Sequence, residues 1–367
     1  MSASETEASE YHSKDFNWET LRQEIENDPS LNYHLLPFPS PQQEEHHSRD
    51  SIKAWQKFHI QHSSGKFFKE RRYLLKEFPE LVSCEDGCKV LEVGCGNGST
   101  ALPILRGNEK IILYACDCSN ETLERAKEFV AASNVISVEH RFHPFYCDFV
   151  TTGFPKWLAC DYCREMFALK GQNYLSDIRE KRTHETDICC VGGVDFITLI
   201  FTLSAVPLQT MPTAIRECFS VLKPGGLLLF RDYGLYDMTM LRFKPEQRVR
   251  FREYMRSDGT RSYFFCPDNV RNLFICAGFI ELEIEYCCVK SVNRRNGKSM
   301  QRVWVHDEHV SSLHIAYGDR FFAYQNIDKL TYLCKFCIPF DSWNKLQEIA
   351  EGPCLSLCVP VSASNFM

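Results

Sequence analysis

A glycine-rich turn at residues 92 to 98 is the strongest candidate for a site that binds a small molecule. It reads Glu92-Val93-Gly94-Cys95-Gly96-Asn97-Gly98 and ends the apolar run KVLEV. Because glycine has no side chain to block the approach, such a turn lets the backbone pass close to a ligand. A dinucleotide-binding turn has the spacing G-x-G-x-x-G/A, and its last position is Ser99 here. The spacing therefore favours a ligand other than a dinucleotide.

The acid followed by three alternate glycines resembles the turn that binds S-adenosylmethionine in class I methyltransferases. The ribose and amino-acid moieties of that cofactor need hydrogen-bond acceptors more than a phosphate cradle. Asp117, at the end of the next apolar run, is placed to accept hydrogen bonds from the two ribose hydroxyls. Asp148 follows a third run and could accept one from the adenine amino group, although a helix cap is an equally ordinary use of an aspartate.

Apolar runs and amphipathic stretches alternate along the chain from residue 89 and would position these side chains. The runs are KVLEV, IILYAC, a strand ending near Cys147, VDFITLIF and GLLLFRDY, with helices expected from about Ser99, after Ser119 and over TAIRECFSVL. Such alternation predicts an α/β fold with a mostly parallel, doubly wound sheet. The runs IELEIEYCCVKSV and QRVWV flank Asn296-Gly297 and predict an antiparallel hairpin that finishes the sheet.

Five segments make up the predicted domain organisation. Residues 81–307 form the main domain, and residues 151–191 interrupt its alternation as an insertion. Residues 51–80 are predicted to form a basic helical extension, with two helices around Ser63, Ser64 and Gly65. Residues 1–50 are polar and punctuated by proline, which predicts a flexible acidic arm. Residues 308–367 follow the end of the alternation as a tail to which the sequence assigns neither helix nor strand.

The charge of the chain is unevenly distributed. The net charge is −6, yet residues 53–76 carry seven Lys and Arg against one acid, and residues 242–261 carry seven against three. Such segregation suits a basic face for an anionic partner. The chain has no run of 18 apolar residues and no arginine before Arg22, so we expect no membrane segment and a location in the cytoplasm, or also the nucleus.

Nineteen cysteines are unusual for a chain with no secretory signal, and most are expected to be reduced and buried. The insertion carries Cys160-x-x-Cys163 and the adjacent Cys189 and Cys190, with His184 nearby; a zinc site and free thiols are both open there. The pairs Cys334/Cys337 and Cys354/Cys358 lie in apolar surroundings that favour burial. We assign no metal to the predicted active site.

Four further strings narrow the function: AWQKFH to KFFKERRYLLKEF (54 to 78), LIFTLSAVP (199 to 207), LFRDYGLYDMTMLRF (229 to 243) and DGTRSYFF (258 to 265). In this order, with the glycine turn, they resemble the methyltransferase-like proteins that make N3-methylcytidine in the anticodon loop of transfer RNA. The resemblance covers roughly residues 52 to 306. It implies a class I methyltransferase fold with a seven-stranded sheet, S-adenosylmethionine as cofactor and tRNA, not DNA, as substrate. Some relatives work with seryl-tRNA synthetase, which makes that enzyme an expected partner.

The resemblance also implies the residues of the cofactor site. It places Gly94, Asp117, Asp148 and Ile200 around S-adenosylmethionine, with Trp55 folding over the cofactor from the basic extension. The family has tyrosine four residues after this tryptophan. This chain has His59 there, so we expect an altered contact.

Asp232, at the end of the strand LLLFRD, is the predicted catalytic carboxylate. Methyl transfer to cytosine N3 moves positive charge onto the base, which a nearby carboxylate would stabilise. We expect Tyr233, Tyr263 and Phe265 to stack on the flipped base, and Arg231 or Arg261 to contact its carbonyl or a neighbouring phosphate. The competing interpretation of Asp232 is an internal salt bridge with an arginine of its own string.

Two other functions remain open from the sequence. One keeps S-adenosylmethionine but changes the acceptor to another RNA, a protein or a small molecule. The other is an inactive methyltransferase fold that binds RNA or a partner as a scaffold. The intact glycine turn and Asp117 argue against a scaffold, which has no need of a cofactor site.

Overall fold

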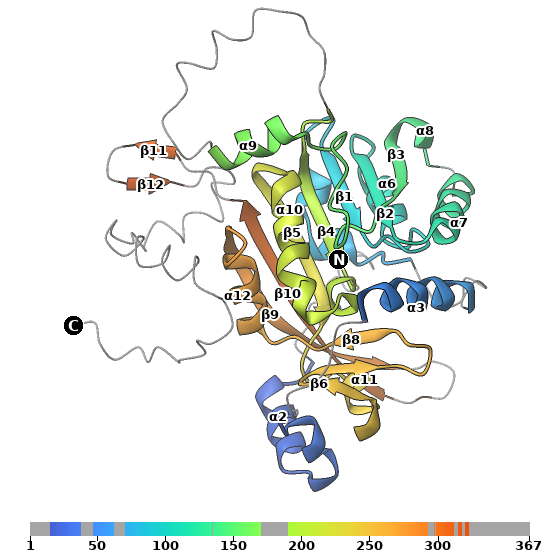
Figure 1. Ribbon diagram of the computed structural model, residues 1–367, viewed down its shortest axis with the longest axis vertical. Coiled ribbons are helices and arrows are strands. Elements are labelled where there is room, and N and C mark those ends of the chain that lie inside the picture. The colour runs from blue at the N-terminus through green and yellow to red at the C-terminus, as the bar shows by residue number, and fades with distance from the viewer. Residues whose placement is uncertain are drawn as a thin grey trace, which may run out of the picture.

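A seven-stranded mixed sheet forms the centre of the molecule (Figure 1). The computed structural model describes residues 15–37, 47–61, 70–133, 135–169, 190–292, 297, 299–311, 315–317 and 320–322. The strand order is β3-β2-β1-β4-β5-β10-β9. Strands β1 to β5 run parallel to one another, and β10 is antiparallel to both β5 and β9. This confirms the predicted α/β class I methyltransferase fold with its antiparallel terminal hairpin.

The five parallel strands arise from the apolar runs of the sequence. They are β1 (Lys89–Val93), β2 (Ile112–Asp117), β3 (Phe142–Tyr146), β4 (Val194–Ile200) and β5 (Leu222–Tyr233). Strand β5 begins at Leu222, before the apolar run GLLLFRDY, and its pairing with β4 shifts register between Val194 and Phe196. Strands β9 (Phe279–Val292) and β10 (Ser299–Ser311) form the hairpin, and β10 extends four residues beyond the predicted domain end at 307.

Helices cover both faces of the sheet. In Figure 1, α10 (Met211–Val221) and α12 (Pro267–Ile275) lie in front of the sheet, where Ile215, Cys218 and Phe274 pack into one core cluster. The other face packs against α4 (Leu74–Glu77), α5 (Glu80–Ser83), α6 (Ala101–Gly107) and α7 (Asn120–Ala131). Ser119 caps α7 as predicted, because its hydroxyl accepts a hydrogen bond from the Thr122 amide at 3.3 Å. Cys266 is the N-cap residue of α12.

The prediction of a flexible arm for residues 1–50 is wrong for residues 15–37. This segment forms α2 (Trp18–Glu26) and the 3-10 helix η1 (Pro29–His34). Leu21 and Ile25, one helical turn apart, are buried in a third core cluster with Met240 and Phe264. Asn17 caps α2, and the ring of Trp18 stacks on Tyr286 at 4.5 Å between centroids. Burial of these few apolar side chains stabilises a segment that is otherwise polar.

Helix α3 (His47–Gln61) is the first element of the predicted basic extension. The second predicted helix is short, since α4 ends at Glu77 and Pro79 precedes α5. The basic and aromatic run Lys66 to Lys69 lies outside the described residues.

A small three-stranded sheet lies beside α3 (Figure 1). It contains β6 (Arg248–Arg250), β7 (Glu253–Met255) and β8 (Arg261–Tyr263), preceded by α11 (Met238–Leu241) and the 3-10 helix η4 (Pro245–Gln247). A methyl group on Gly259, in the β7–β8 turn, would lie 3.3 Å from the Cβ atom of Ala54, so this turn approaches α3 closely. The small sheet was not predicted.

The remaining short elements are α8 (Val138–Arg141), α9 (Asp161–Leu169), the 3-10 helices η2 (Leu203–Ala205) and η3 (Leu208–Thr210), and the hairpin of β11 (Ile315–Tyr317) and β12 (Arg320–Phe322). Helix α9 lies in the predicted insertion. No helix among the described residues is long and apolar enough to cross a membrane.

Candidate active site

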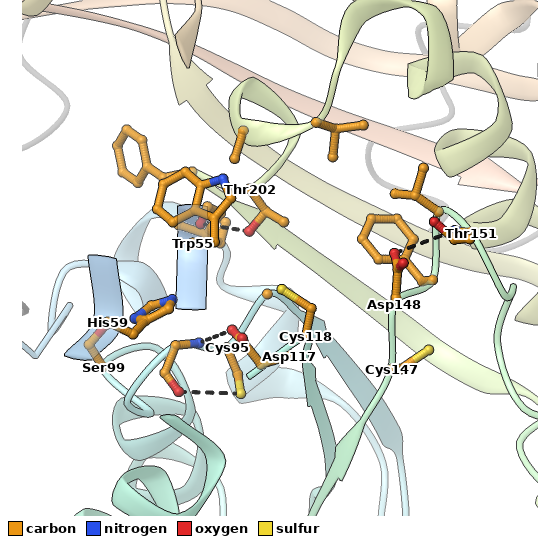
Figure 2. Close-up of a pocket in the computed structure, with 18 of the residues that line it drawn as sticks. Trp55, His59, Cys95, Ser99, Asp117, Cys118, Cys147, Asp148, Thr151 and Thr202 are labelled. Atoms are coloured by element: carbon orange, nitrogen blue, oxygen red, sulfur yellow. Dashed lines mark hydrogen bonds between the residues drawn. The ribbon is translucent and has the colours of Figure 1, made fainter. Parts of the chain in front are cut away.

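A pocket opens at the carboxyl ends of β1, β2 and β4, where ligands bind in doubly wound sheets. Figure 2 shows Trp55 and His59 on one side, Asp148 and Thr151 on the other, and Asp117 between them. Seven of the nine predicted cofactor residues line this pocket: Trp55, His59, Gly94, Gly96, Asp117, Asp148 and Ile200. The fold thus brings together side chains that are up to 145 positions apart in the sequence, from Trp55 to Ile200.

Two glycines of the turn form part of the pocket wall. A methyl group on Gly94, whose φ is +70°, would lie 2.5 Å from Thr202 Cγ2, because Thr202 packs directly over this residue. The Thr202 hydroxyl is itself held by a 2.9 Å hydrogen bond to the Val93 carbonyl. A methyl group on Gly96 would meet no protein atom within 4 Å and would occupy the pocket instead. The turn therefore keeps backbone surface open for a ligand.

The predicted residues Glu92 and Gly98 do not line the pocket. A methyl group on Gly98 would be 3.5 Å from Ala126 and Val130, so this glycine lets the turn pack on α7. Glu92 is buried beneath the turn, and burial raises the pKa of its carboxyl to about 8, opposed by Arg71 and by a hydrogen bond with Thr100. Gly98 and Glu92 therefore stabilise the turn without lining the pocket.

The raised pKa of Glu92 leads to a testable pH dependence. An ordinary glutamate has a pKa of 4.5, so the folded protein holds this proton to a higher pH than the unfolded chain does. The stability contributed by protonated Glu92 is therefore lost as the pH rises through about 8. We expect Glu92→Gln to flatten the fall in the free energy of unfolding between about pH 5 and pH 8, measured by urea denaturation. The exposed Glu139→Gln serves as control and should leave the pH profile unchanged; equal profiles for Glu92→Gln and the wild type would contradict this assignment.

Asp117 is the central acceptor of the pocket. Its Oδ2 accepts a 3.0 Å hydrogen bond from the Gly96 amide, and its Oδ1 accepts one of 3.0 Å from the Ser119 amide. Burial raises the pKa of Asp117, while His59 and the backbone amides oppose this effect. Each carboxylate oxygen has a second lone pair, so Asp117 can accept further hydrogen bonds from a ligand.

Asp148 lies at the opposite side of the pocket and also caps a turn. Its Oδ1 is 3.4 Å from the Thr151 amide. Both interpretations of this residue from the sequence are therefore compatible, since the capping carboxylate also lines the pocket.

Trp55 and His59 enter the pocket from α3. The Arg125 guanidinium of α7 donates a 2.8 Å hydrogen bond to the His59 carbonyl and holds α3 in place. The Trp55 indole packs edge-on against Phe58, at 5.2 Å between centroids. Its Nε1 atom is buried without a hydrogen-bond partner among the described residues. A buried donor of this kind at a pocket wall is available to an acceptor on a ligand.

Sequence reasoning missed the other residues that line the pocket: Phe201, Thr202, Ala205, Val206 and Pro207, and also Cys95, Ser99, Cys118, Cys147, Phe149, Val150 and Thr151. Arg71 belongs to the basic segment 53–76 that the sequence assigns to an anionic partner, yet it lines the pocket. Its guanidinium donates a 3.0 Å hydrogen bond to the Thr100 hydroxyl and lies 5.1 Å from the centroid of Phe201. The string LIFTLSAVP was a signal for part of this lining, because it contains the last residues of β4 and continues beyond its carboxyl end.

Asp232 does not reach the pocket, which corrects its predicted contact with the substrate. Its side chain is fully buried and accepts 2.8 Å hydrogen bonds from the amides of Ser204 and Tyr233. Burial raises the pKa of Asp232 to about 6, opposed by these hydrogen bonds. The alternative of a salt bridge within its own string is also wrong, since Arg231 pairs with Glu77. Through its hydrogen bond to the Ser204 amide, Asp232 instead attaches η2, which leads into the pocket residues 205–207, to the end of β5.

The other predicted catalytic residues are also packed into the fold. Arg231 is fully buried, and Arg261 is 7% exposed and 3.1 Å from Glu253, so neither is available to contact a base or a phosphate. Tyr263 is 6% exposed and packs edge-on against the buried Phe265. Tyr233 is half-buried and tilts against the pocket residue Phe201 at 5.1 Å between centroids. Of this group, Tyr233 lies nearest to the pocket wall by its contacts.

The pocket fits S-adenosylmethionine. It offers a wall that an extra methyl group at Gly96 would obstruct, carboxylates at two separate positions and a buried indole N–H in need of an acceptor. These match a ligand with a ribose, an amine and a carboxylate.

A family model described as a methyltransferase domain matches residues 67–283. Over 261 residues the chain is 34% identical to the tRNA N(3)-cytidine methyltransferase METTL6 of Homo sapiens, an alignment that covers 70% of this chain and 79% of the relative. It is 31% identical over 314 residues to the tRNA N(3)-cytidine methyltransferase METTL2 of Xenopus tropicalis, covering 75% and 82% of the two chains.

A solved structure of a SAM-dependent methyltransferase from Anabaena variabilis aligns with 75% of this chain and all (100%) of its own, at a TM-score of 0.49 and 12% sequence identity.

Proposed function

Because the chain belongs to the family of tRNA N3-cytidine methyltransferases, we propose that it methylates N3 of a cytidine in the anticodon loop of tRNA. The observation that carries this proposal is the pocket at the carboxyl ends of β1, β2 and β4, with the glycine turn and Asp117 in its wall. S-adenosylmethionine is the methyl donor, and when bound it supplies an electrophilic methyl group on a sulfonium.

We assign the cofactor contacts as follows. Gly94 and Gly96 let the backbone approach the donor, and Asp117 accepts hydrogen bonds from its ribose. Asp148 accepts from the adenine amino group, and Trp55, His59 and Ile200 cover the cofactor. The Arg71 guanidinium lies beside the turn, through its hydrogen bond to Thr100, and is placed to pair with the carboxylate of the amino-acid moiety.

Cytosine N3 has an in-plane lone pair at neutral pH, so the protein does not need a strong base to create the nucleophile. The protein must hold the base unpaired, aim N3 at the donor and exclude water. We propose that Phe201, supported by Tyr233, forms the apolar surface against which the base is held. Asp232 is a positioning residue that fixes this wall through the Ser204 and Tyr233 amides, and Arg261 and Tyr263 stabilise the small sheet beside it.

Exposed cations of the small-sheet region supply the proposed tRNA contact. Arg242 and Lys244 are exposed, as are the apolar side chains of Phe251 and Met255. Several other arginines of residues 242–261 are held internally, for example Arg252 by Asn269 at 2.6 Å, so the basic face is smaller than the sequence indicated.

Charge reversal at this surface should weaken tRNA binding without affecting the cofactor. We expect Arg242→Glu with Lys244→Glu to lower tRNA affinity at least about tenfold and to reduce its dependence on salt, because two phosphate contacts are lost. The affinity for S-adenosylmethionine should stay unchanged. Lys110→Glu, at the amino end of β2, is the matched control. Equal tRNA affinity for the double variant and the control would contradict this surface.

Seryl-tRNA synthetase is the proposed partner. If the synthetase delivers its tRNA to this protein, adding it should raise the rate of methyl transfer to serine tRNA and leave the rate on other tRNAs unchanged. No change in the rate on serine tRNA would show that the synthetase is not a partner in this reaction.

The acceptor class can be tested by transfer of a tritiated methyl group from S-adenosylmethionine to total tRNA, ribosomal RNA or a protein extract. The proposal predicts label in tRNA alone. Label in ribosomal RNA or protein would replace the proposed acceptor, and no label despite cofactor binding would indicate a scaffold. The Gly94→Ala variant is the negative control for each acceptor.

A further inference from the structure

Three cysteines of the insertion lie close together near the start of α9. Cys160 and Cys163 come from its first part, and Cys190 comes from its end. The sulfur atoms of Cys160, Cys163 and Cys190 are all within 4.8 Å of one another, and the Sγ atoms of Cys163 and Cys190 are 3.4 Å apart. We propose that these three thiolates bind one Zn²⁺ ion that ties the ends of the insertion together. This site is separate from the cofactor pocket.

The spacing of the sulfur atoms suits zinc. Tetrahedral Zn²⁺ binds thiolates at about 2.3 Å, which puts neighbouring sulfur atoms about 3.8 Å apart. A disulfide would need its two sulfur atoms at about 2.05 Å. Three sulfurs that converge at metal-ligand separation favour a shared ion over a bond between two of them. In zinc sites with three protein ligands, water or another group takes the fourth position.

The backbone holds the two ends of the insertion in register. The Val191 amide donates a 2.7 Å hydrogen bond to the Trp157 carbonyl, and the Gly193 amide donates one of 2.9 Å to the Leu158 carbonyl. These two bonds hold the chain next to Cys190 beside residues 157 and 158, just before α9. Cys163 follows Cys160 one helical turn later in α9, so the Cys-x-x-Cys spacing turns both sulfurs to the same side.

Helix α9 is itself anchored to the main domain. The Arg164 guanidinium donates hydrogen bonds to the Ser220 hydroxyl at 2.8 Å and to the Phe154 carbonyl at 2.7 Å. These hydrogen bonds hold α9, and with it Cys160 and Cys163, in a fixed position, as a binding site requires.

Groups with positive charge or partial positive charge surround the three sulfur atoms. The Gly192 amide donates a 3.2 Å hydrogen bond to Cys190 Sγ. Cys160 directly precedes α9, a helix of nine residues, and Cys163 lies in its first turn, where the helix dipole stabilises negative charge. The ammonium of Lys89 is 2.6 Å from the Val191 carbonyl, next to Cys190. All three cysteines are half-buried, so an ion can reach them from solvent.

The proposed zinc ion would stabilise the connection between β3 and β4. The connection between β3 and β4 begins with Cys147 to Thr151, which line the cofactor pocket, and continues through Phe154 and Leu158, which are buried in the core. A zinc ion bound by Cys160, Cys163 and Cys190 would join the two ends of the insertion and so stabilise this connection, including its residues that line the pocket.

The direct test maps the reactivity of each thiol in the full-length wild-type protein purified with zinc. Differential alkylation with iodoacetamide, read by peptide mass spectrometry, should show Cys160, Cys163 and Cys190 protected until a chelator is added. Cys276 is exposed and should react equally with and without the chelator. Equal reactivity of the three cysteines in both conditions, or recovery of a Cys163–Cys190 disulfide, would overturn the proposal.

A second experiment measures metal content by mass spectrometry of the native protein. Cys163→Ser and Cys190→Ser should each lower bound zinc by about one ion per chain relative to the wild type, and Cys276→Ser should lower it by none. Comparing variants with the wild type isolates this site from other cysteines of the chain. Unchanged zinc in both variants would overturn the proposal, and if neither variant folds, the alkylation of the wild-type protein decides.

Discussion

Gly94→Ala should reduce the affinity for S-adenosylmethionine by roughly 10- to 100-fold and abolish methyl transfer. The new methyl group would lie 2.5 Å from Thr202 Cγ2 and 2.6 Å from Thr202 Oγ1, and the hydrogen bond from Thr202 to Val93 keeps this side chain in place. Overpacking of this kind costs about 1–3 kcal/mol, and every 1.4 kcal/mol changes an affinity about tenfold. Relief of the clash must move the turn or the wall, and both line the pocket. Isothermal titration calorimetry measures the effect.

A matched control separates the clash from backbone strain. Gly87 has a φ of +76°, close to the +70° of Gly94, but a methyl group there meets nothing within 4 Å. Gly87→Ala should therefore share the cost of a left-handed alanine, about 1–2 kcal/mol of stability, and keep full cofactor affinity. If both variants bind S-adenosylmethionine equally, the pocket described above does not hold the cofactor.

Glu77→Ala should destabilise the protein by about 3–5 kcal/mol, the usual result of breaking a buried ion pair. Glu77 Oε1 accepts hydrogen bonds from the Arg231 guanidinium and, at 3.1 Å, from His306 Nδ1. The Arg231 side chain is fully buried and lies 4.3 Å from the ring centroid of Trp304. Removing Glu77 would leave this guanidinium in the interior without its carboxylate. Urea denaturation measures the change, and the exposed Glu85→Ala should shift stability by less than about 0.5 kcal/mol.

Glu77 and His306 also make the stability of the protein depend on pH. Although burial opposes the charged forms, Arg231 and His306 hold the pKa of Glu77 below its ordinary value, and Glu77 raises the pKa of His306. The stability from Glu77 is therefore lost as the pH falls through its lowered pKa. That from His306 is lost as the pH rises from 6.5 through its raised pKa. Glu77→Ala should remove both changes; a loss of stability below 1 kcal/mol with an unchanged pH profile would contradict the buried cluster.

The main sheet could be predicted because its strands are continuous apolar runs separated by amphipathic helices. The hairpin of β9 and β10 followed from its length and the Asn-Gly turn. The small sheet of β6 to β8 could not be predicted, since each strand has three residues and depends on contacts made only after folding, such as that of Arg261 with Glu253. Helix α2 was missed because only a few of its side chains, such as Leu21 and Ile25, are buried.

The cofactor side of the pocket was predictable for a geometric reason. Acids and glycines that follow parallel strands must meet at the same edge of the sheet, which places Gly94 and Asp117 together. The burial of Asp232 was not predictable, because a motif gives the identity of a side chain but not the direction in which it points. The position of Arg71 was also hidden, since its contacts with Thr100 and Phe201 depend on how the segment before α4 crosses the sheet edge.

Analysis of tRNA nucleosides after reaction with S-adenosylmethionine that carries a trideuterated methyl group tests the central claim most directly. The tRNA should come from cells that lack the endogenous activity, with seryl-tRNA synthetase present in a parallel reaction. The account predicts N3-methylcytidine that carries all three deuterium atoms with the wild-type protein and none with Gly94→Ala. Label in a different nucleoside, or unlabelled tRNA in both reactions while calorimetry shows the cofactor bound, would contradict it.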